Sequence, residues 1–216
     1  MNKKLKVGDY FGLNLADGSF IIGRLIFDPT QKAVQEDGHH NFTFVQDCYL
    51  IQVYKGIHKE FDEKKLSSLE TLIPGLYIYK SAFYKKLYKP NWQYLGHKKI
   101  NLDEVDFPMV ISNAEKYYFQ YGEINIPIAM EEDLDIRRTT HTTQSQVIIM
   151  ALHYMERDDI IRKDYFMPKT FLEKADVRFA EEQLQNRIFN MTGINLTKSY
   201  HELALEHGFD LSRFYK

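Results

Sequence analysis

The residues that could carry out covalent chemistry are few, and their surroundings do not suit catalysis. The single cysteine, Cys48, lies in the middle of an apolar stretch, where a buried and unreactive thiol is expected. No G-x-S-x-G turn, which would expose a nucleophilic serine, occurs in the chain. Carboxylate pairs such as Asp158-Asp159 and Glu181-Glu182 usually form the solvated face of a helix. These patterns predict a protein that is not an enzyme, and a hydrolase whose site leaves no motif is the remaining enzymatic alternative.

The histidines and glycines form no recognisable metal or phosphate site. The chain has eight histidines, but none belongs to an H-E-x-x-H motif or to an i, i+4 pair. His201 and His207 would face different sides of one helix, and the adjacent His39 and His40 would point oppositely in an extended chain. The phosphate-binding patterns G-x-x-x-x-G-K-S/T and G-x-G-x-x-G are absent. We therefore expect neither a metal nor a cofactor.

One stretch interleaves aromatic with basic side chains. Rings such as Tyr84, Tyr88 and Trp92 could stack on bases while the lysines hold phosphates, which would make a nucleic-acid- or peptide-binding module. Equally, the rings could belong to a core strand beside a solvated loop, with the lysine stems lying on aromatic faces. Both interpretations remain open for this stretch, which comprises Tyr77, Tyr79, Lys80, Phe83, Tyr84, Lys85, Lys86, Tyr88, Lys89, Trp92 and Tyr94.

A second stretch, at residues 131–135, is strongly acidic. Its carboxylates could attract a basic partner through electrostatic complementarity, which would mainly raise the association rate and the specificity of binding. They could also form a plain solvated linker. The candidate binding residues in this acidic run are Glu131, Glu132, Asp133 and Asp135.

The composition excludes several classes of protein. The chain has 216 residues, of which 28 are Lys or Arg and 30 are Asp or Glu, so its formal charge is −2. A dedicated nucleic-acid binder would normally be strongly basic, so nucleic acid is an unlikely partner. The longest apolar run, from Val147 to Leu152, is far shorter than the roughly 18 residues of a membrane span. Because the N-terminus also lacks an apolar signal stretch, we expect a cytoplasmic protein.

The part of the chain before residue 130 has the punctuation of β-structure. Short apolar runs alternate with glycines, and Asp17-Gly18 between two alternating runs is a hairpin signal. One or two helical turns could fall within 61–72, where Ser67 and Glu70 fit a capping box. Strands of this length and spacing favour a small antiparallel β barrel or a curled sheet, comparable in size with an SH3 domain. The expected strands cover residues 11–15, 20–27, 43–53, 76–79, 92–95, 117–120 and 124–128.

The part after residue 143 has a helical period. Thr143 and Gln146 fit a capping box before one helix, and Ser199 and Glu202 fit another. A helix between them should end before Gly193. The sequence therefore predicts an α+β protein with a β-rich domain at 1–130, an acidic and polar linker at 131–143 and a helical region at 144–216.

The β-rich part also resembles a known family. The stretch from Lys6 to Leu15, then Asp17-Gly18 and Gly23-Arg24-Leu25, is similar to the opening of the immunity protein 26 family of bacterial polymorphic toxin systems. Trp92-Gln93-Tyr94-Leu95-Gly96 and Phe107-Pro108 resemble that family's tryptophan-glycine and phenylalanine-proline elements. Asn14 departs from the pattern, because family members often have proline at this position. The resemblance covers residues 6–128 and leaves the helical region outside it.

The resemblance implies a protein that acts by binding. It would neutralise a cognate toxin in the producing cell without catalysis, and the acidic run would suit a basic toxin such as a nuclease. The turn at Asp17-Gly18, a bend at Gly23 and the large ring of Trp92 agree with a scaffold role for the matching positions. The expected structural residues are Gly8, Asp9, Asp17, Gly18, Gly23, Trp92, Gly96, Phe107 and Pro108.

Overall fold

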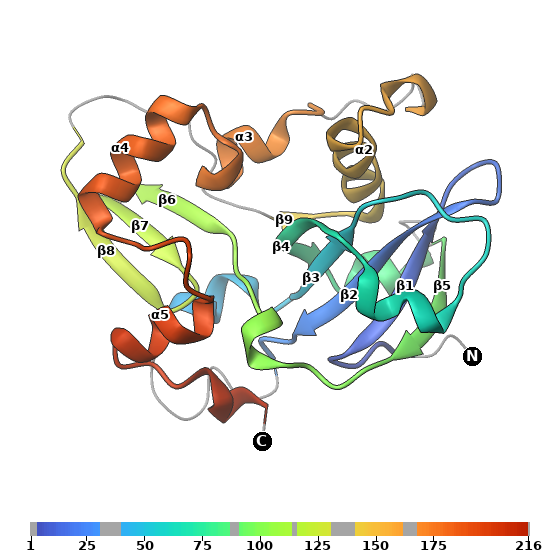
Figure 1. Ribbon diagram of the computed structural model, residues 1–216, viewed down its shortest axis with the longest axis horizontal. Coiled ribbons are helices and arrows are strands. Elements are labelled where there is room, and N and C mark those ends of the chain that lie inside the picture. Colours follow the sequence, from blue (N-terminus) through green and yellow to red (C-terminus); the bar gives the residue numbers. More distant parts are fainter. Residues whose placement is uncertain are drawn as a thin grey trace.

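A computed structural model describes residues 4–30, 40–86, 91–113, 116–130, 141–161 and 168–215 of the chain. It contains two β-sheets and a set of short helices, so the predicted α+β class is confirmed. The larger sheet has six strands in the order β5-β1-β2-β3-β4-β9, and the smaller has three in the order β6-β7-β8. Figure 1 shows the larger sheet in one half of the molecule and the smaller sheet with α4 and α5 in the other.

All strand pairs are antiparallel except β4 with β9. The larger sheet does not close on itself among the described residues, so the closed-barrel alternative is wrong and the sheet is open. The strands are β1 (Asp9–Asn14), β2 (Phe20–Phe27), β3 (Cys48–Tyr54), β4 (Thr71–Tyr79), β5 (Trp92–His97), β6 (Met109–Asn113), β7 (Tyr117–Tyr121), β8 (Ile124–Ile128) and β9 (His141–Thr142).

The helices are short. The α-helices are α1 (Ser81–Tyr84), α2 (Gln144–Tyr154), α3 (Phe171–Ala175), α4 (Glu182–Thr192) and α5 (Tyr200–Glu206). The 3-10 helices are η1 (His40–Val45), η2 (Glu63–Ser68), η4 (Leu102–Glu104), η5 (Asp158–Ile160), η6 (Val177–Phe179) and η7 (Leu211–Phe214).

Local signals formed several elements as predicted. Asp17-Gly18 makes the turn between β1 and β2: Gly18 has a φ of +85°, and the Asp17 carboxylate accepts a hydrogen bond from the Ser19 amide at 3.0 Å. The capping boxes of Thr143 and Ser199 both form, and α4 ends at Gly193 in the left-handed conformation. These predictions are confirmed.

The predicted strand at 43–53 is wrong over its first half. Residues 40–45 form η1, and β3 begins only at Cys48. A 3-10 helix places residues three apart on one side, so Phe42 and Val45 are buried while Phe44 is 83% exposed. In so short a run the helical and the strand periods both bring apolar residues close together, so the sequence pattern alone does not distinguish them.

One further prediction needs correction, and one strand was not expected. The helical turn in the 61–72 stretch is η2, and its N-terminal cap is Asp62, whose carboxylate accepts from the Lys64 amide at 3.0 Å, so Ser67 and Glu70 are not the capping pair. Strand β6 was not predicted, although its register with β7 is regular from Met109 to Asn113.

One face of the larger sheet is covered by helices. Alternate residues of its strands, such as Phe11, Ile21 and Ile51, pack against Phe83 of α1 and Leu152 of α2. In Figure 1, α2 and α3 lie along one side of the two sheets. This face forms a continuous apolar core.

The opposite face is shared between two apolar clusters. Towards β4 it packs with the smaller sheet and the C-terminal helices, so that Leu50 and Tyr77 belong to the same cluster as Phe107, Ile188 and Tyr200. The second cluster lies near η2 and comprises Tyr10, Phe20, Ile22 and Tyr54, with Phe61, Leu66, Leu69 and Leu95 packed against it.

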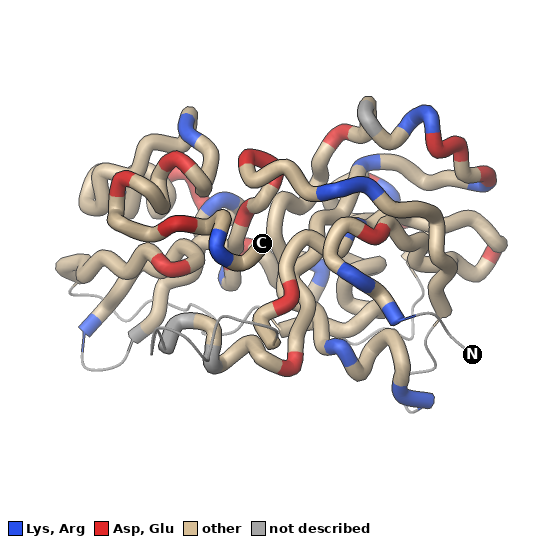
Figure 2. Tube along the Cα trace, turned by 90° about the horizontal axis from the view of Figure 1, so that it is seen from below, with Lys and Arg blue, Asp and Glu red and all other residues tan. Residues whose placement is uncertain are grey.

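Charged positions of both signs are interspersed along the chain (Figure 2). No helix within the described ranges is long and apolar enough to cross a membrane.

A buried ionic network joins the C-terminal region to the β-structure. Arg178 of η6 binds Asp176 and Asp106, each at 2.6 Å, and donates to the Phe107 carbonyl at 3.0 Å. The Asp106 carboxylate also accepts from the hydroxyl of Tyr121 at 2.7 Å. Burial alone would lower the pKa of Arg178, but the charges of Asp176 and Asp106 outweigh it and raise the pKa above its usual range.

Replacing Arg178 should therefore destabilise the fold strongly. The side chain of Asp176 is fully buried, so Arg178→Met leaves an unpaired carboxylate in the interior and should lower the free energy of unfolding by about 3–5 kcal/mol. Urea denaturation measures the loss. The control is Arg157→Met, which removes an exposed pair with Asp159 and should leave the midpoint unchanged. Equal effects of the two variants would contradict the role of the buried network.

Candidate binding groove

Three polar side chains form a row across the middle of the larger sheet. Tyr10 on β1 lies opposite Arg24 on β2, and Arg24 lies opposite Gln52 on β3. All three are buried, and Arg24 is only 1% exposed. Side chains two residues apart along a strand lie on the same face of the sheet. The polar row therefore lies on the face of the larger sheet that carries the two apolar clusters, and it occupies positions between them.

The buried guanidinium of Arg24 is held by the segment that crosses the sheet after β5. It binds the Glu104 carboxylate at 2.7 Å and donates to the carbonyls of Lys98 and Lys99 at 3.0 and 3.2 Å. Its carbon Cζ lies 4.8 Å from the centre of the Tyr10 ring. Arg24 Nε, by contrast, is buried and has no hydrogen-bond partner among the described residues.

The neighbouring polar groups extend this network. Gln52 donates to the Glu104 carbonyl at 2.6 Å and accepts from the hydroxyl of Tyr54 at 3.1 Å. The rings of Tyr10 and Tyr54 stack with their centres 5.9 Å apart. The floor of the site is therefore rigid.

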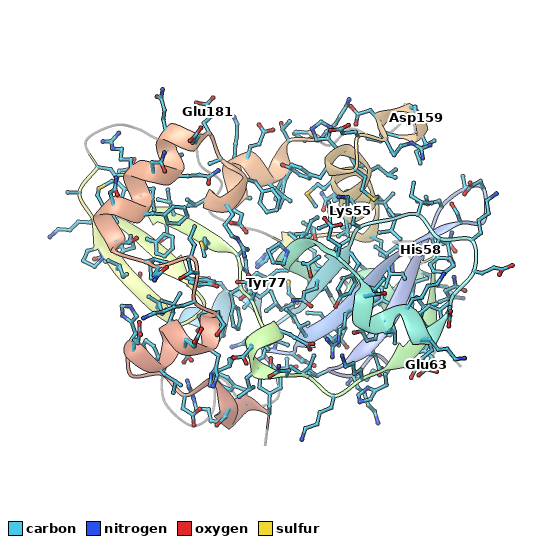
Figure 3. The ribbon with its side chains drawn as sticks, viewed as in Figure 1. Lys55, His58, Glu63, Tyr77, Asp159 and Glu181 are labelled. Atoms are coloured by element: carbon cyan, nitrogen blue, oxygen red, sulfur yellow. The ribbon has the colours of Figure 1, made fainter. Side chains whose placement is uncertain are left out.

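Two adjoining hollows share Leu66 and Leu69 in their linings, and together we call them the sheet groove. The smaller hollow lies over the polar row, and the larger lies beside it. Figure 3 labels Lys55 and His58, which follow β3 and line the larger hollow. The smaller hollow, of about 310 Å³, is lined by Tyr10, Arg24, Gln52, Tyr54, Leu66, Leu69, Thr71, Pro74, Lys98, Asp103, Glu104 and Asp106. The larger, of about 500 Å³, is lined by Ile22, Lys55, His58, Glu60, Phe61, Asp62, Lys65, Leu66, Ser68, Leu69 and Glu70.

Burial affects the pKa values of the titratable side chains that line the groove. It raises the pKa of Tyr10, so the phenol stays neutral. Burial alone would lower the pKa of Arg24, but the hydrogen bond to Glu104 and the neighbouring tyrosines and carboxylate raise it overall. Burial and the charge of Lys65 lower the pKa of His58 below 6.5, against a smaller opposite effect of the Lys55 backbone. The imidazole of His58 is therefore neutral at pH 7, and its Nε2 atom is buried without a hydrogen-bond partner among the described residues.

The predicted aromatic binding residues lie outside this groove. Tyr84 uses its hydroxyl to accept from the Leu5 amide at 2.8 Å, and Trp92 is partly buried and donates to the Phe83 carbonyl at 3.0 Å. In the same stretch the rings of Tyr77 and Phe83 are buried in the core. Most of these rings therefore pack in or against the core, and few are exposed enough to stack on a base. Tyr88 and the acidic run Glu131, Glu132, Asp133 and Asp135 fall outside the described residues.

The residues expected to be structural surround β1 and β5. The carboxylate of Asp9 accepts from the Lys6 amide at 2.9 Å and lies 2.8 Å from His97 Nδ1, which joins the chain before β1 to the end of β5. Gly8 has a φ of +94°, and a Cβ atom there would lie 2.5 Å from the carbonyl oxygen of Lys98. A Cβ atom on Gly23 would lie 2.5 Å from the ring of Phe11.

The other expected structural residues lie nearer to the groove. Gly96 is buried on β5, with Phe61 and Glu63 as its neighbours. Phe107 is buried between the larger sheet and Tyr200, at 4.7 Å between ring centres, and Pro108 beside it is also buried.

Cys48 is buried in the core, and burial raises the pKa of its thiol to about 12. The thiol is therefore uncharged and a weak nucleophile. Within the described ranges, no group of three or more His, Cys, Asp or Glu side chains could hold a metal ion.

The residues of the sheet groove were not predicted from the sequence. One signal was present, because Arg24 is a charged residue inside an otherwise apolar strand and a fully buried charge needs partners. The partners themselves could not be named, since Glu104 lies 80 residues away along the chain.

Comparison with known proteins gives one match. A family model described as immunity protein 26 matches residues 6–116, which is just over half of the chain and confirms the resemblance of the sequence motifs. The matched part includes β1 to β6 and all the residues that line the sheet groove. No curated protein and no solved structure gives a match.

The lowered histidine pKa values predict that stability falls in mild acid. Burial lowers the pKa of His58 and of His141 below 6.5, so below that pH the unfolded chain binds protons that the folded chain excludes. The urea midpoint should therefore decrease from about pH 7.5 to about pH 5.5, and less steeply in the double variant His58→Gln, His141→Gln. His207→Gln, at an exposed position, is the control that keeps the wild-type slope. An unchanged slope in the double variant would contradict the prediction.

Proposed function

The chain belongs to the immunity protein 26 family, and on this premise we propose that it binds a cognate bacterial toxin domain and neutralises it as a stoichiometric inhibitor. The toxin would be part of a polymorphic toxin system, and neutralisation would take place in the cytoplasm of the producing cell or its kin. Inhibition would require only that the protein cover the toxin's active surface, with no chemistry of its own.

The observation that carries this proposal is the extent of the family match. The matched residues include the larger sheet from β5 to β4, and the Asp17-Gly18 motif within them makes the turn between β1 and β2. A rigid preformed surface suits tight binding, because little freedom is lost when it meets its partner. A specific complex of this kind would bury about 800 Å² on each partner.

The proposal also assigns a role to each part of the chain. Residues 1–130 would form the toxin-binding domain, residues 131–143 a linker whose end pairs with β4 as β9, and residues 144–216 a region that influences the choice of partner. Support for a close connection comes from the apolar cluster that Leu50 and Tyr77 share with Ile188 and Tyr200. The helical region therefore packs on the same sheet that the family match covers.

Co-expression with the product of a neighbouring toxin gene tests the proposal. We expect cells that express the toxin to survive when this chain is present, and an inactivated toxin domain to elute with it as one complex on size-exclusion chromatography. Survival should require a stoichiometric amount of the protein, because occlusion lasts only while the complex does. An unrelated protein of similar size is the control, and failure to bind any neighbouring gene product would refute the proposal.

The acidic run gives a second prediction about the toxin. If the toxin is basic, as a nuclease domain would be, reversing Glu131, Glu132, Asp133 and Asp135 to lysine should slow association and reduce its dependence on salt. Stopped-flow binding at low and high salt measures both effects. Neutral substitution of the same four residues by glutamine should give an intermediate rate. Identical rates for all three proteins would remove this role of the run.

A further inference from the structure

We infer that the sheet groove is the part of the surface that receives the toxin, and that it takes an extended segment with an apolar side chain and a lysine or arginine a few residues away. This inference rests on the proposed function and specifies where the partner docks and what chemistry it presents. It depends on two features of the groove: a group of apolar side chains in the larger hollow and a set of exposed acidic groups.

The apolar feature is a group of side chains in the lining of the larger hollow. Ile22, Phe61, Leu66 and Leu69 come together there, and they belong to the apolar cluster near η2. Charged residues also line this hollow, including the exposed pair of Lys55 with Glu70. An apolar pocket inside a charged rim is the arrangement in which one inserted side chain contributes much of the binding energy of an interface.

The second feature is the charge of the lining. Four lining residues are basic and six are acidic, and one of the six, Asp106, pairs with Arg178 outside the lining at 2.6 Å. Arg24 and Lys98 both face Glu104, at 2.7 and 3.9 Å, and Lys55 pairs with Glu70 at 3.0 Å. The basic lining residues are therefore largely balanced by carboxylates of the groove itself.

Several carboxylates of the lining remain available to bind a cation of the partner. Glu60, Asp62 and Asp103 are exposed acidic residues of the lining, and Lys65 is the remaining basic one. Asp103 lies 3.4 Å from the hydroxyl of Ser199, a neutral contact that leaves its charge in place. A lysine or arginine of the partner would supply the missing positive charge.

The two features lie in adjoining hollows, because Leu66 and Leu69 line both of them. One extended segment can therefore place an apolar side chain in the larger hollow and a basic side chain near Asp103 of the smaller one.

The same acidic excess argues against single-stranded nucleic acid as the occupant of the groove. Phosphates would meet the exposed carboxylates of Glu60, Asp62 and Asp103, with Lys65 as the basic lining residue that remains to bind them.

Selection of random linear peptides displayed on phage tests the inference on the full-length protein. We expect enriched peptides to pair an apolar residue with a nearby lysine or arginine. Leu66→Asp places a charge in the wall shared by both hollows, and it should weaken binding of the enriched peptides by about tenfold or more. Enrichment of acidic peptides, or no enrichment, would overturn the inference.

A charge exchange provides a test that does not depend on the stability of a core variant. Asp103 is exposed, so Asp103→Lys should fold normally, reject the enriched peptides and select peptides with Asp or Glu in place of the basic residue. The matched controls lie at exposed sites outside the groove: Leu205→Asp repeats the Leu66→Asp change, and Glu182→Lys also replaces a carboxylate by lysine. Both should bind as the wild type does. Thermal unfolding of all four variants verifies that each is folded.

The toxin experiment separates this inference from the proposed function. If the toxin domain binds the wild type and binds both groove variants equally well, the groove is not the docking site, while the immunity function stands. If both groove variants lose toxin binding and both controls keep it, the inference is supported. If no neighbouring gene product binds the wild type, the proposed function fails and the groove loses its assigned partner.

Discussion

The burial of one charged side chain organises much of this structure. Arg24 points into the middle of a sheet face, and a guanidinium in that position is tolerated only if hydrogen bonds and an opposite charge replace its water. The segment from Lys98 to Glu104 supplies them, so it must cross the sheet after β5. This crossing separates two apolar clusters and forms one wall of the groove. The polar row therefore links the stability of the sheet to the shape of its exposed surface.

The C-terminal region completes the core of the matched part of the chain. The ring of Tyr200 lies 4.7 Å from Phe107 and 4.8 Å from Tyr121, and its hydroxyl accepts from the Glu123 amide at 2.9 Å. A Cβ atom on Gly122 would lie 2.3 Å from that hydroxyl, so the fit requires glycine. Figure 3 shows Tyr77 in the middle of the molecule, and Tyr77 belongs to the cluster that joins both sheets to these helices. The helices and the smaller sheet thus support the face that carries the groove.

Elements with a complete local signal could be predicted, and elements that depend on distant contacts could not. The hairpin at Asp17-Gly18 and the helix that begins after Ser199 need only residues a few positions apart. By contrast, η1 and an expected strand share the same apolar pattern, and the choice between them is made by what Phe42 and Val45 contact. Strand β6 was missed for a similar reason, since its pairing partner β7 is what makes it a strand.

The sequence by itself determined the α+β class, the ends of the main helices, the buried state of Cys48 and the family to which the chain belongs. These depend on composition, on local periodicity and on short motifs. Only the tertiary structure decided that Tyr10, Arg24 and Gln52 stand in one row, that Glu104 meets Arg24, and that Leu66 and Leu69 wall a groove above them. The physical reason is that strand register brings residues from separate parts of the chain opposite one another, and register is set by the packing of the whole sheet and not by any single segment.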